Sequence, residues 1–320
     1  MNKFLTNKAG VAFILVLSLA FTAFAQTKLR TAVNYDTDNK ADFVIFRPTN
    51  NAWYIAKSAG GVTITQFGLS TDDFMTPGDF DGDGKGDIAV WRDTTGVWYY
   101  LKSSDNSFVA NQFGVAGDEP VARDYDGDGK TDLGVVRRTG GAMIWYSQNS
   151  TTGFKTNQFG LSTDFTAPGD YDGDGKFDLA VQRPGATAAS QATFFIQAST
   201  AGFSAIGWGL SNDICVPGDY DGDGKTDLAV VREGATATDN LVWAYLGSSN
   251  NTARFISFGV TGTDLTVQND YDGDGKCDIA IWRDTVGDFY YLTSSSNSTA
   301  LVNFHWGASG DFPVAGYDTH

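Results

Sequence analysis

Short runs of alternating apolar and polar residues recur along the chain, separated by breaks rich in Gly, Asp and Ser. One representative stretch contains four such runs, Met75–Phe80, Ile88–Arg92, Val97–Lys102 and Phe108–Phe113. Period-two alternation with β-branched and aromatic residues predicts β-strands. No segment after residue 25 has a convincing helical period. We therefore expect an all-β protein.

An aspartate-rich nonapeptide marks the repeat in which these strands recur. Five nearly identical copies, one weaker copy and one truncated copy begin at Asp79, Asp124, Asp170, Asp219, Asp270, Asn34 and Gly316. The start positions 34, 79, 124, 170, 219, 270 and 316 are separated by 45, 45, 46, 49, 51 and 46 residues. Such a period indicates an array of one supersecondary unit, with propeller blades among the candidates. Four antiparallel strands repeated around a ring describe a β-propeller.

Each full copy has carboxylates at positions 1, 3, 5 and 9 and glycine at position 6. Alternating Asp in a tight turn brings several hard oxygens to one point, which suits Ca²⁺ with its six to eight oxygen ligands. Without a cation, carboxylates about 4 Å apart would repel each other by on the order of several kcal/mol per pair. Mg²⁺ prefers to keep its waters, and a zinc site would need His or Cys. The pattern therefore favours calcium.

The first copy departs from this pattern, because Asn34 replaces the first Asp and Asn39 replaces the glycine. Asn tolerates the left-handed conformation, so a site there stays open. Position 7 is Lys in each of the six copies that extend to it, and we interpret it as a ligand through its backbone carbonyl, with the side chain in solvent. We expect five to six structural Ca²⁺ ions. The predicted ligands are Asp79, Asp81, Asp83, Lys85, Asp87, Asp124, Asp126, Asp128, Lys130, Asp132, Asp170, Asp172, Asp174, Lys176, Asp178, Asp219, Asp221, Asp223, Lys225, Asp227, Asp270, Asp272, Asp274, Lys276, Asp278 and, in the first copy, Asn34, Asp36, Asp38, Lys40 and Asp42.

The nonapeptide allows two other interpretations, a solvated turn and an EF-hand. A solvated turn would explain a single copy, because Asp and Gly favour turns, but five copies in register favour a metal. An EF-hand needs a Glu at position 12 between two helices. Position 12 of the second copy is Val90, inside a run that is typical of a strand. The nonapeptides are therefore expected to be loops within β-hairpins.

The first 25 residues have the features of a signal peptide. Lys3 and Lys8 precede the apolar stretch Val11–Phe24, and Ala23-Phe24-Ala25 provides a small-x-small cleavage signal. The stretch is short for a membrane span, and an uncleaved anchor is the alternative. We expect cleavage after Ala25, a propeller over residues 26–320, and a location in the periplasm, at the cell surface or outside the cell.

The formal net charge of −16 is concentrated in the nonapeptides. Of 38 acidic residues only Glu119 and Glu233 are Glu, which leaves 36 Asp, and 20 of these lie in the five full copies. This acidity indicates metal ligation, and the absence of a basic patch argues against nucleic-acid binding. The only two cysteines, Cys215 and Cys277, exclude a disulfide scaffold. Whether they pair is left open.

The Asp-x-Asp-x-Asp-Gly-x-x-Asp loop resembles that of the FG-GAP/VCBS repeat family, which includes the propeller of integrin α chains and many secreted bacterial proteins. The family's Phe-Gly pair also occurs, beginning at Phe67, Phe113, Phe159 and Phe258, with Trp208 and Trp306 as variants. The resemblance covers residues 27–320 and implies Ca²⁺ between the first two strands of each blade. Six four-strand units fit between residues 31 and 307. The tail Pro313–Tyr317 repeats a first strand and is left over, overlapping or competing with Thr31–Tyr35 at ring closure. We predict six blades, with seven, as in integrins, as the alternative.

An Arg follows the last Asp of each copy by five residues, and an aromatic cluster such as Trp98-Tyr99-Tyr100 follows it. These residues are Arg47, Arg92, Arg137, Arg183, Arg232 and Arg283. We interpret each Arg as stacked on or paired beside an inter-blade aromatic. A ring of sugar-binding pockets is the alternative.

Strand order places the nonapeptides and the third-to-fourth strand connections on one face of the ring. The second-to-third connections and the blade crossovers lie on the other face. Insertions in the fourth and fifth repeats, Ala186–Gln191 and Gly234–Asn240, fall on this second face. Per-repeat insertions on one face often mark the binding side.

We expect an extracellular binding or adhesion module for a protein or a glycan, with oligomeric state undetermined. An exported polysaccharide lyase or hydrolase is the alternative, and a structural surface protein is a third. The chain has only two His, His305 and His320, and no nucleophilic triad is recognisable. We therefore predict no enzymatic activity, although paired Asp can act on glycosides.

Overall fold

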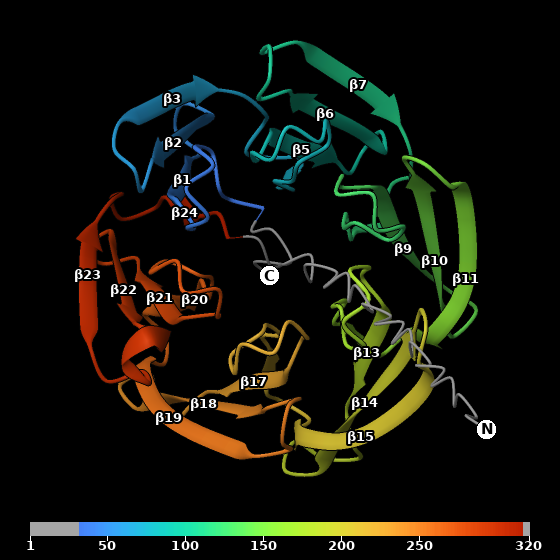
Figure 1. Ribbon diagram of the computed structural model, residues 1–320, viewed down its shortest axis with the longest axis vertical. Helices are drawn as coiled ribbons and strands as arrows, with labels where there is room; N and C mark the ends of the chain where they lie inside the picture. The colour runs from blue at the N-terminus through green and yellow to red at the C-terminus, as the bar shows by residue number, and fades with distance from the viewer. Residues whose placement is uncertain (1–31, 316–320) are drawn as a thin grey trace, which may run out of the picture.

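The computed structural model describes residues 32–315; the predicted signal peptide and the truncated seventh nonapeptide lie outside this range. Six antiparallel sheets of four strands each stand as blades around a ring (Figure 1). The predicted all-β propeller with six blades is confirmed.

The strands of blades one to three have the following bounds. Blade one contains β24 (Phe312–Pro313), β1 (Phe43–Arg47), β2 (Ala52–Ala56) and β3 (Val62–Gln66); blade two contains β4 (Asp73–Met75), β5 (Ile88–Arg92), β6 (Val97–Leu101) and β7 (Phe108–Gln112); blade three contains β8 (Glu119–Pro120), β9 (Leu133–Thr139), β10 (Ala142–Asn149) and β11 (Gly153–Leu161).

Blades four to six continue in the same order. Blade four contains β12 (Phe165–Thr166), β13 (Leu179–Arg183), β14 (Gln191–Ala198) and β15 (Gly202–Leu210); blade five contains β16 (Ile214–Cys215), β17 (Leu228–Arg232), β18 (Asn240–Leu246) and β19 (Ala253–Val260); blade six contains β20 (Asp264–Thr266), β21 (Ile279–Arg283), β22 (Asp288–Leu292) and β23 (Leu301–His305).

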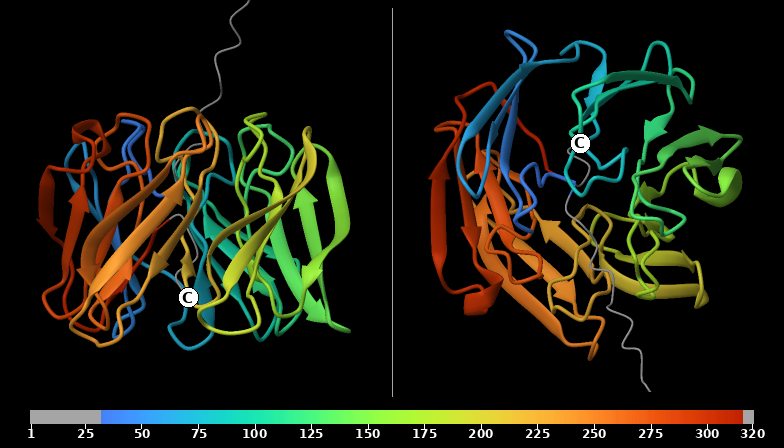
Figure 2. Two further views of the ribbon diagram at one scale, coloured as in Figure 1. Left: turned by 90° about the horizontal axis from the view of Figure 1, so that it is seen from below. Right: turned by 45° about the horizontal axis from the view of Figure 1, so that its top comes forward.

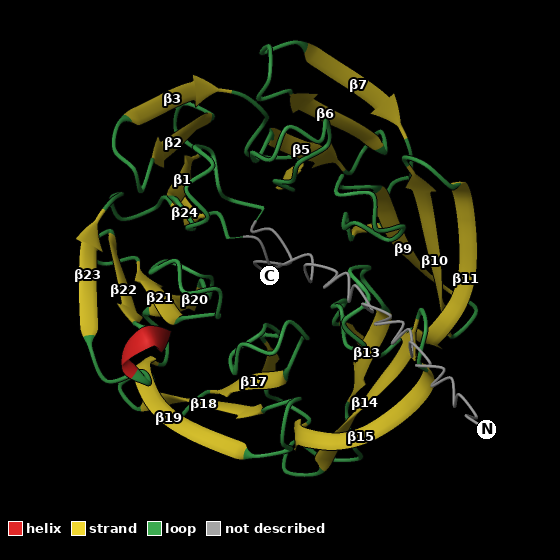
Figure 3. Cartoon of the chain, in the orientation of Figure 1, coloured by secondary structure: helices red, strands yellow, loops and turns green. Residues whose placement is uncertain are grey.

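The blades stand side by side, and their connections gather on two opposite faces (Figure 2). Strands and loops make up almost all of the described chain (Figure 3), and its only helical element is the 3-10 turn η1 (Ser294–Ser296). None of the described residues forms a helix of the length and apolarity that a membrane crossing needs.

The ring closes in blade one, whose innermost strand comes from the C-terminal end of the described chain. β24 pairs antiparallel with β1, with Ile45 opposite Pro313 and Phe46 opposite Phe312. This corrects the sequence-based count, in which residues 31–35 formed the first strand and the tail was left over. The stretch around Val33 forms a turn instead. Closing a ring with a strand from the other end of the chain covers an edge that would otherwise be open.

The Phe-Gly pairs lie where one blade packs against the next. Gly68 has a φ of +94°, and a Cβ on it would lie 3.1 Å from Cγ1 of Val90 in blade two. The Phe67 carbonyl accepts a 3.1 Å hydrogen bond from Nε1 of Trp53, which is fully buried. The Phe-Gly signature therefore supplies both the close backbone approach and the acceptor for a core tryptophan.

The first strands are shorter than the sequence predicts. β4 ends at Met75, whereas the pattern predicted a strand over Met75–Phe80. Beyond Met75 the pairing continues only through a 2.9 Å hydrogen bond from the Thr76 amide to the Ala89 carbonyl oxygen and the isolated bridge between Gly78 and Asp87, because the chain then enters the nonapeptide turn.

Candidate metal centres

The nonapeptides are here called Asp loops one to six. Loops two to six connect the first and second strands of their blades, and loop one directly precedes β1, the second strand of blade one. In loops two to six, one oxygen from each Asp at positions 1, 3 and 9 lies within 4.8 Å of the others. These groups are Asp79, Asp81 and Asp87; Asp124, Asp126 and Asp132; Asp170, Asp172 and Asp178; Asp219, Asp221 and Asp227; and Asp270, Asp272 and Asp278. The convergence predicted from the spacing is therefore present at three of the four carboxylate positions.

The Asp at position 1 organises the turn. In loop two, Oδ1 of Asp79 accepts a 2.6 Å hydrogen bond from the Gly82 amide, and Oδ2 accepts a 2.8 Å bond from the Gly84 amide. Both glycines have a positive φ, +80° and +88°. The chain can wrap around one carboxylate because glycine adopts this conformation without strain.

The Asp at position 9 ties the loop to the next hairpin of its own blade. Oδ2 of Asp87 accepts a 2.9 Å hydrogen bond from the Phe80 amide, and Oδ1 accepts a 2.6 Å bond from the Ser103 amide in the β6–β7 connection. Burial raises the pKa of Asp87 to about 6, although these hydrogen bonds act in the opposite direction. The same cause raises the pKa values of Asp132, Asp178, Asp227 and Asp278 to about 7.

The Asp at position 5 is not part of the converging group in any loop. In loop two, Oδ1 of Asp83 instead accepts hydrogen bonds from the Lys85 amide at 2.9 Å and from the Ser103 hydroxyl at 2.8 Å. Its predicted role as a ligand, and that of the Lys85 carbonyl, stay predictions.

In five of the six loops the lysine at position 7 lies against the neighbouring loop and does not point into solvent, which corrects the sequence-based expectation. The half-buried Lys130 side chain lies across Gly82 of the preceding loop, where an added Cβ would stand 2.8 Å from its Cε. The same contact joins Lys176 to Gly127, Lys225 to Gly173, Lys276 to Gly222 and Lys40 to Gly273. Position 4 is therefore glycine partly because the neighbouring lysine occupies the space beside it.

The hydroxyl residues that surround the loops were not predicted from the sequence. In blade two the Ser103 hydroxyl contacts Asp83, and the Ser104 hydroxyl donates a 2.6 Å hydrogen bond to Asp81. The equivalent residues are Ser58, Ser150, Thr151, Ser199, Thr200, Ser248, Ser249, Ser294 and Ser295. Their recurrence after every third strand is a signal that could have identified them.

The donor set fits a hard cation. Oδ1 of Asp126 and Oδ1 of Asp221, both at position 3, are buried without a hydrogen-bond partner among the described residues. A buried carboxylate oxygen without a partner is costly unless a cation neutralises it. The converging groups contain only carboxylates, the ligand type that Ca²⁺ prefers.

Loop one keeps the turn but has a weaker donor set. Thr37 and Asn39 adopt positive φ values of 70° and 64°. The single side-chain oxygen of Asn34 accepts from the amides of Asp36 at 3.2 Å and Thr37 at 2.9 Å. The amide side chain brings no negative charge, so a cation would be held less strongly there than in the other loops.

The repeated arginines form ion pairs on the opposite face. Nε and Nη2 of Arg92 donate to Oδ1 and Oδ2 of Asp73 at 2.7 and 2.9 Å, and the guanidinium lies 4.6 Å from the ring centre of Tyr99. The stacked ring belongs to the same blade, which corrects the inter-blade prediction. Equivalent pairs join Arg137 to Asp118, Arg183 to Asp164, Arg232 to Asp213, Arg283 to Asp264 and Arg47 to Asp311. In blades two to six the partner Asp precedes the Arg by 19 residues, and this constant spacing could have predicted the ion pairs.

Blade five is the exception to this stacking. Ala244 stands where the other blades place the stacking ring, opposite Val230 in the register. The side chain of Arg232 is 45% exposed, the highest value among the six arginines. In the same region Cys215 is a free cysteine, as is Cys277 in loop six.

Residues 124–181 match the family model described as the FG-GAP-like repeat. The search of the curated proteins gave no match. Among solved structures, a functionally unknown protein from Desulfotomaculum acetoxidans DSM 771 is 10% identical, with 83% of this chain and 80% of that chain covered at a TM-score of 0.46. A structure titled "Kluyveromyces lactis Hsv2 complete loop 6CD" is also 10% identical, with 88% and 84% covered at a TM-score of 0.44.

The matched segment runs from Asp loop three into β13 and therefore contains a nearly complete repeat unit. The same loop, Phe-Gly turn and four-stranded sheet recur around the closed ring. The chain is a six-bladed β-propeller, and residues 124–181 within it are similar to the FG-GAP-like repeat.

Proposed function

We propose that the protein is an extracellular binding module, for a protein or a glycan, on a propeller stabilised by calcium in Asp loops two to six. The observation that carries the calcium part is the convergence of three carboxylates in each of these loops. Calcium would be held by the Asp residues at positions 1, 3 and 9, and would supply the positive charge that these partly buried groups lack.

A structural role for the cation is supported by the way the loops are joined. The amide at position 8 of each loop donates to the carbonyl oxygen at position 1 of the preceding loop, at 2.6 to 2.8 Å. These bonds run from Gly86 to Asn34, Thr131 to Asp79, Phe177 to Asp124, Thr226 to Asp170, Cys277 to Asp219 and Ala41 to Asp270. A cation that orders one loop therefore also orders a backbone acceptor for its neighbour.

Binding is favoured over catalysis because the repeated polar groups already have structural partners. The arginines are paired with Asp, and the loop carboxylates face one another. Nδ1 of His305 lies 2.5 Å from Oδ1 of Asp288, and its side chain is 73% exposed. An exposed His–Asp pair lacks the water-excluded setting in which catalytic groups act most strongly.

Export is the part of the proposal that rests on the sequence alone. Residues 1–25 have the composition of a signal peptide, and millimolar calcium outside cells suits extracellular sites of about 10⁻⁴ to 10⁻³ M affinity.

The test combines metal analysis with binding measurements on the mature chain. We expect about five calcium ions per chain by elemental analysis, and saturable binding to glycans or extracellular proteins that is lost on chelation and restored by calcium. A metal-free protein with an unchanged melting curve would contradict the calcium part. Turnover of a polysaccharide by the purified protein would contradict the binding assignment.

A further inference from the structure

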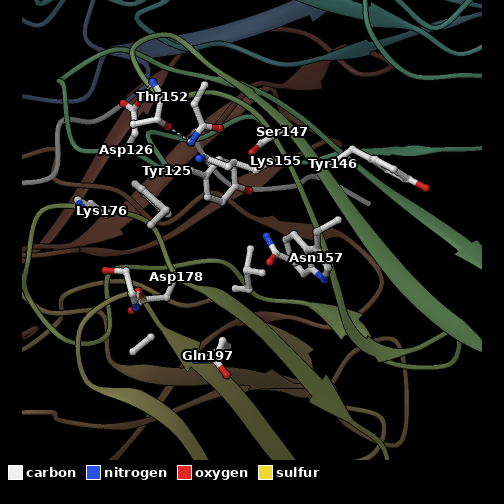
Figure 4. Close-up of a pocket in the computed structure, with 16 residues that line it drawn as sticks. Tyr125, Asp126, Tyr146, Ser147, Thr152, Lys155, Asn157, Lys176, Asp178 and Gln197 are labelled. Atoms are coloured by element: carbon white, nitrogen blue, oxygen red, sulfur yellow. Dashed lines mark hydrogen bonds between the residues drawn. The ribbon is translucent and has the colours of Figure 1, made fainter.

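A pocket of about 420 Å³, lined by both polar and apolar residues, lies between blades three and four (Figure 4). Blade three contributes Tyr125 from Asp loop three, Ser147 from β10 and Lys155 from β11. Blade four contributes Lys176 from Asp loop four and Gln197 from β14. The volume falls in the range of about 300–1,000 Å³ that is typical of small-molecule sites.

The pocket exists because blade three lacks a ring that three other blades have. In blades two, five and six the third strand places Tyr100, Tyr245 and Tyr291 against the aromatic residue at loop position 2, with ring centres 4.8, 4.9 and 5.1 Å apart. The equivalent residue in blade three is Ser147, opposite Gly134 in the register. No described ring stacks on Tyr125, so the space of a tyrosine side chain is left beside it.

The lining is suited to a hydroxylated anion. The ammonium groups of Lys155 and Lys176 form no ion pair with any described acidic residue at the distances of a salt bridge. Asn157 of β11 and Gln197 of β14 line the pocket with amide side chains (Figure 4). Asn149, which also lines the pocket and is 5% exposed, has an Oδ1 without a hydrogen-bond partner among the described residues.

Two carboxylates, Asp126 and Asp178, also belong to the lining. Both are members of the converging groups of Asp loops three and four. With calcium in these loops their charge is neutralised, and the two lysines then dominate the charge of the pocket. The charge argument therefore rests on the calcium part of the proposed function, whereas the shape of the pocket does not.

We propose that this pocket binds a single hexuronate unit, such as the acidic sugar of a polysaccharide. The sugar ring stacks on Tyr125, its carboxylate pairs with Lys155 and Lys176, and its hydroxyls bond with Asn149, Asn157 and Gln197. This assigns the glycan alternative of the proposed function to a specific site and ligand class. It also places that site between blades, away from the inserted loops on the opposite face.

The experiment titrates the mature, calcium-loaded chain with sodium D-galacturonate, D-galactose and sodium acetate by isothermal calorimetry. D-galactose has the ring without the charge, and acetate has the charge without the ring. We expect galacturonate to bind at least about tenfold more tightly than either, since charge-assisted bonds and ring contacts act together.

Ser147→Tyr fills the pocket with the residue that blades two, five and six use, so the fold should be retained. We expect it to weaken galacturonate binding by about tenfold or more, because the ligand and the ring need the same space. Lys155→Gln should weaken binding about fivefold. Arg254→Gln is the matched control, since Arg254 has the same register position in blade five, where Tyr245 fills the space, and it should leave affinity unchanged.

Three results would overturn the assignment: no saturable galacturonate binding, equal binding of galactose or acetate, or full affinity in S147Y. A melting curve with and without calcium is recorded on the same samples. Normal calcium stabilisation without galacturonate binding would reject the pocket alone, whereas loss of calcium stabilisation would reject the calcium part of the proposed function.

Discussion

The amide of Ala41 donates a 2.7 Å hydrogen bond to the carbonyl oxygen of Asp270, which joins Asp loop one to Asp loop six. The same two loops touch again where Lys40 lies across Gly273. Blade one is thus fixed to blade six on the loop face as well as through β24. The weak nonapeptide of loop one keeps these contacts although Asn34 replaces its first Asp, which indicates that ring closure depends on the turn more than on the metal ligands.

Removing the closing strand should destabilise the whole ring. Deletion of residues 312–320 removes β24 and the buried Val314, whose burial alone contributes about 1.5–3 kcal/mol. We expect a markedly lower melting temperature and a tendency to associate through the exposed edge of β1. Deletion of residues 316–320 is the control and should melt like the full mature chain. Equal melting temperatures for the two truncations would show that β24 is dispensable.

Calcium removal should lower stability strongly. A ligand at a hundred times its Kd stabilises the native state by about 2.7 kcal/mol per site. Loss of several sites should therefore lower the melting temperature by more than about 10 °C. Calorimetry of the metal-depleted protein, before and after calcium is returned, checks this, with magnesium as the comparison ion. Full recovery with magnesium at equal concentration would argue against calcium as the specific ligand.

The metal-free protein should become less stable as pH rises. Burial raises the native-state pKa of Asp132 to about 7 from an ordinary value of 3.8, so the native state binds more protons than the unfolded state between these values. The free energy of unfolding then falls as pH increases from about 4 to about 7. Calcium binding favours the ionised carboxylates and should remove or reverse the trend. Melting temperatures at pH 5 and pH 8, with and without metal, test the sign.

The fold could be predicted from the sequence because residues within each repeat mark where its strands begin. The last Asp of each loop directly precedes the second strand, so that β5 was predicted at Ile88–Arg92 without error. The closing strand could not be assigned in the same way, since residues 31–35 and the tail carry similar patterns and only the closed ring decides between them. Contacts between neighbouring units, such as Lys130 on Gly82, also depend on how blades pack. The pocket beside Ser147 could not be predicted in this way, because the missing ring becomes evident only when the strand registers of the blades are compared.

Export can be tested directly. The sequence predicts cleavage after Ala25, so N-terminal sequencing of the protein expressed with its own leader should begin at Gln26. Replacing Val11–Phe24 by polar residues should retain the protein in the cytoplasm. Exported protein that begins at Met1, or protein held in the inner membrane, would contradict the prediction.

The inserted connections and the Asp loops should have opposite effects on the binding of a macromolecular partner. The insertions join β13 to β14 and β17 to β18, and the structure corrects their ends, because Gln191 and Asn240 already belong to strands. Replacing residues 184–190 or 233–239 by the turn Asp93–Gly96 of blade two should weaken partner binding about tenfold or more while the melting temperature changes little, since surface loops tolerate changes of length.

The contrasting variant is Asp219→Asn with Asp221→Asn, which removes two carboxylates from loop five. We expect it to lower the melting temperature. It should weaken binding only at temperatures where the blade unfolds, because the lost carboxylates affect binding only by destabilising the blade. Affinity and melting measured on the same samples separate the two cases. Unchanged affinity in both loop replacements, with lost affinity in a still-folded loop-five variant, would place the partner on the Asp-loop face.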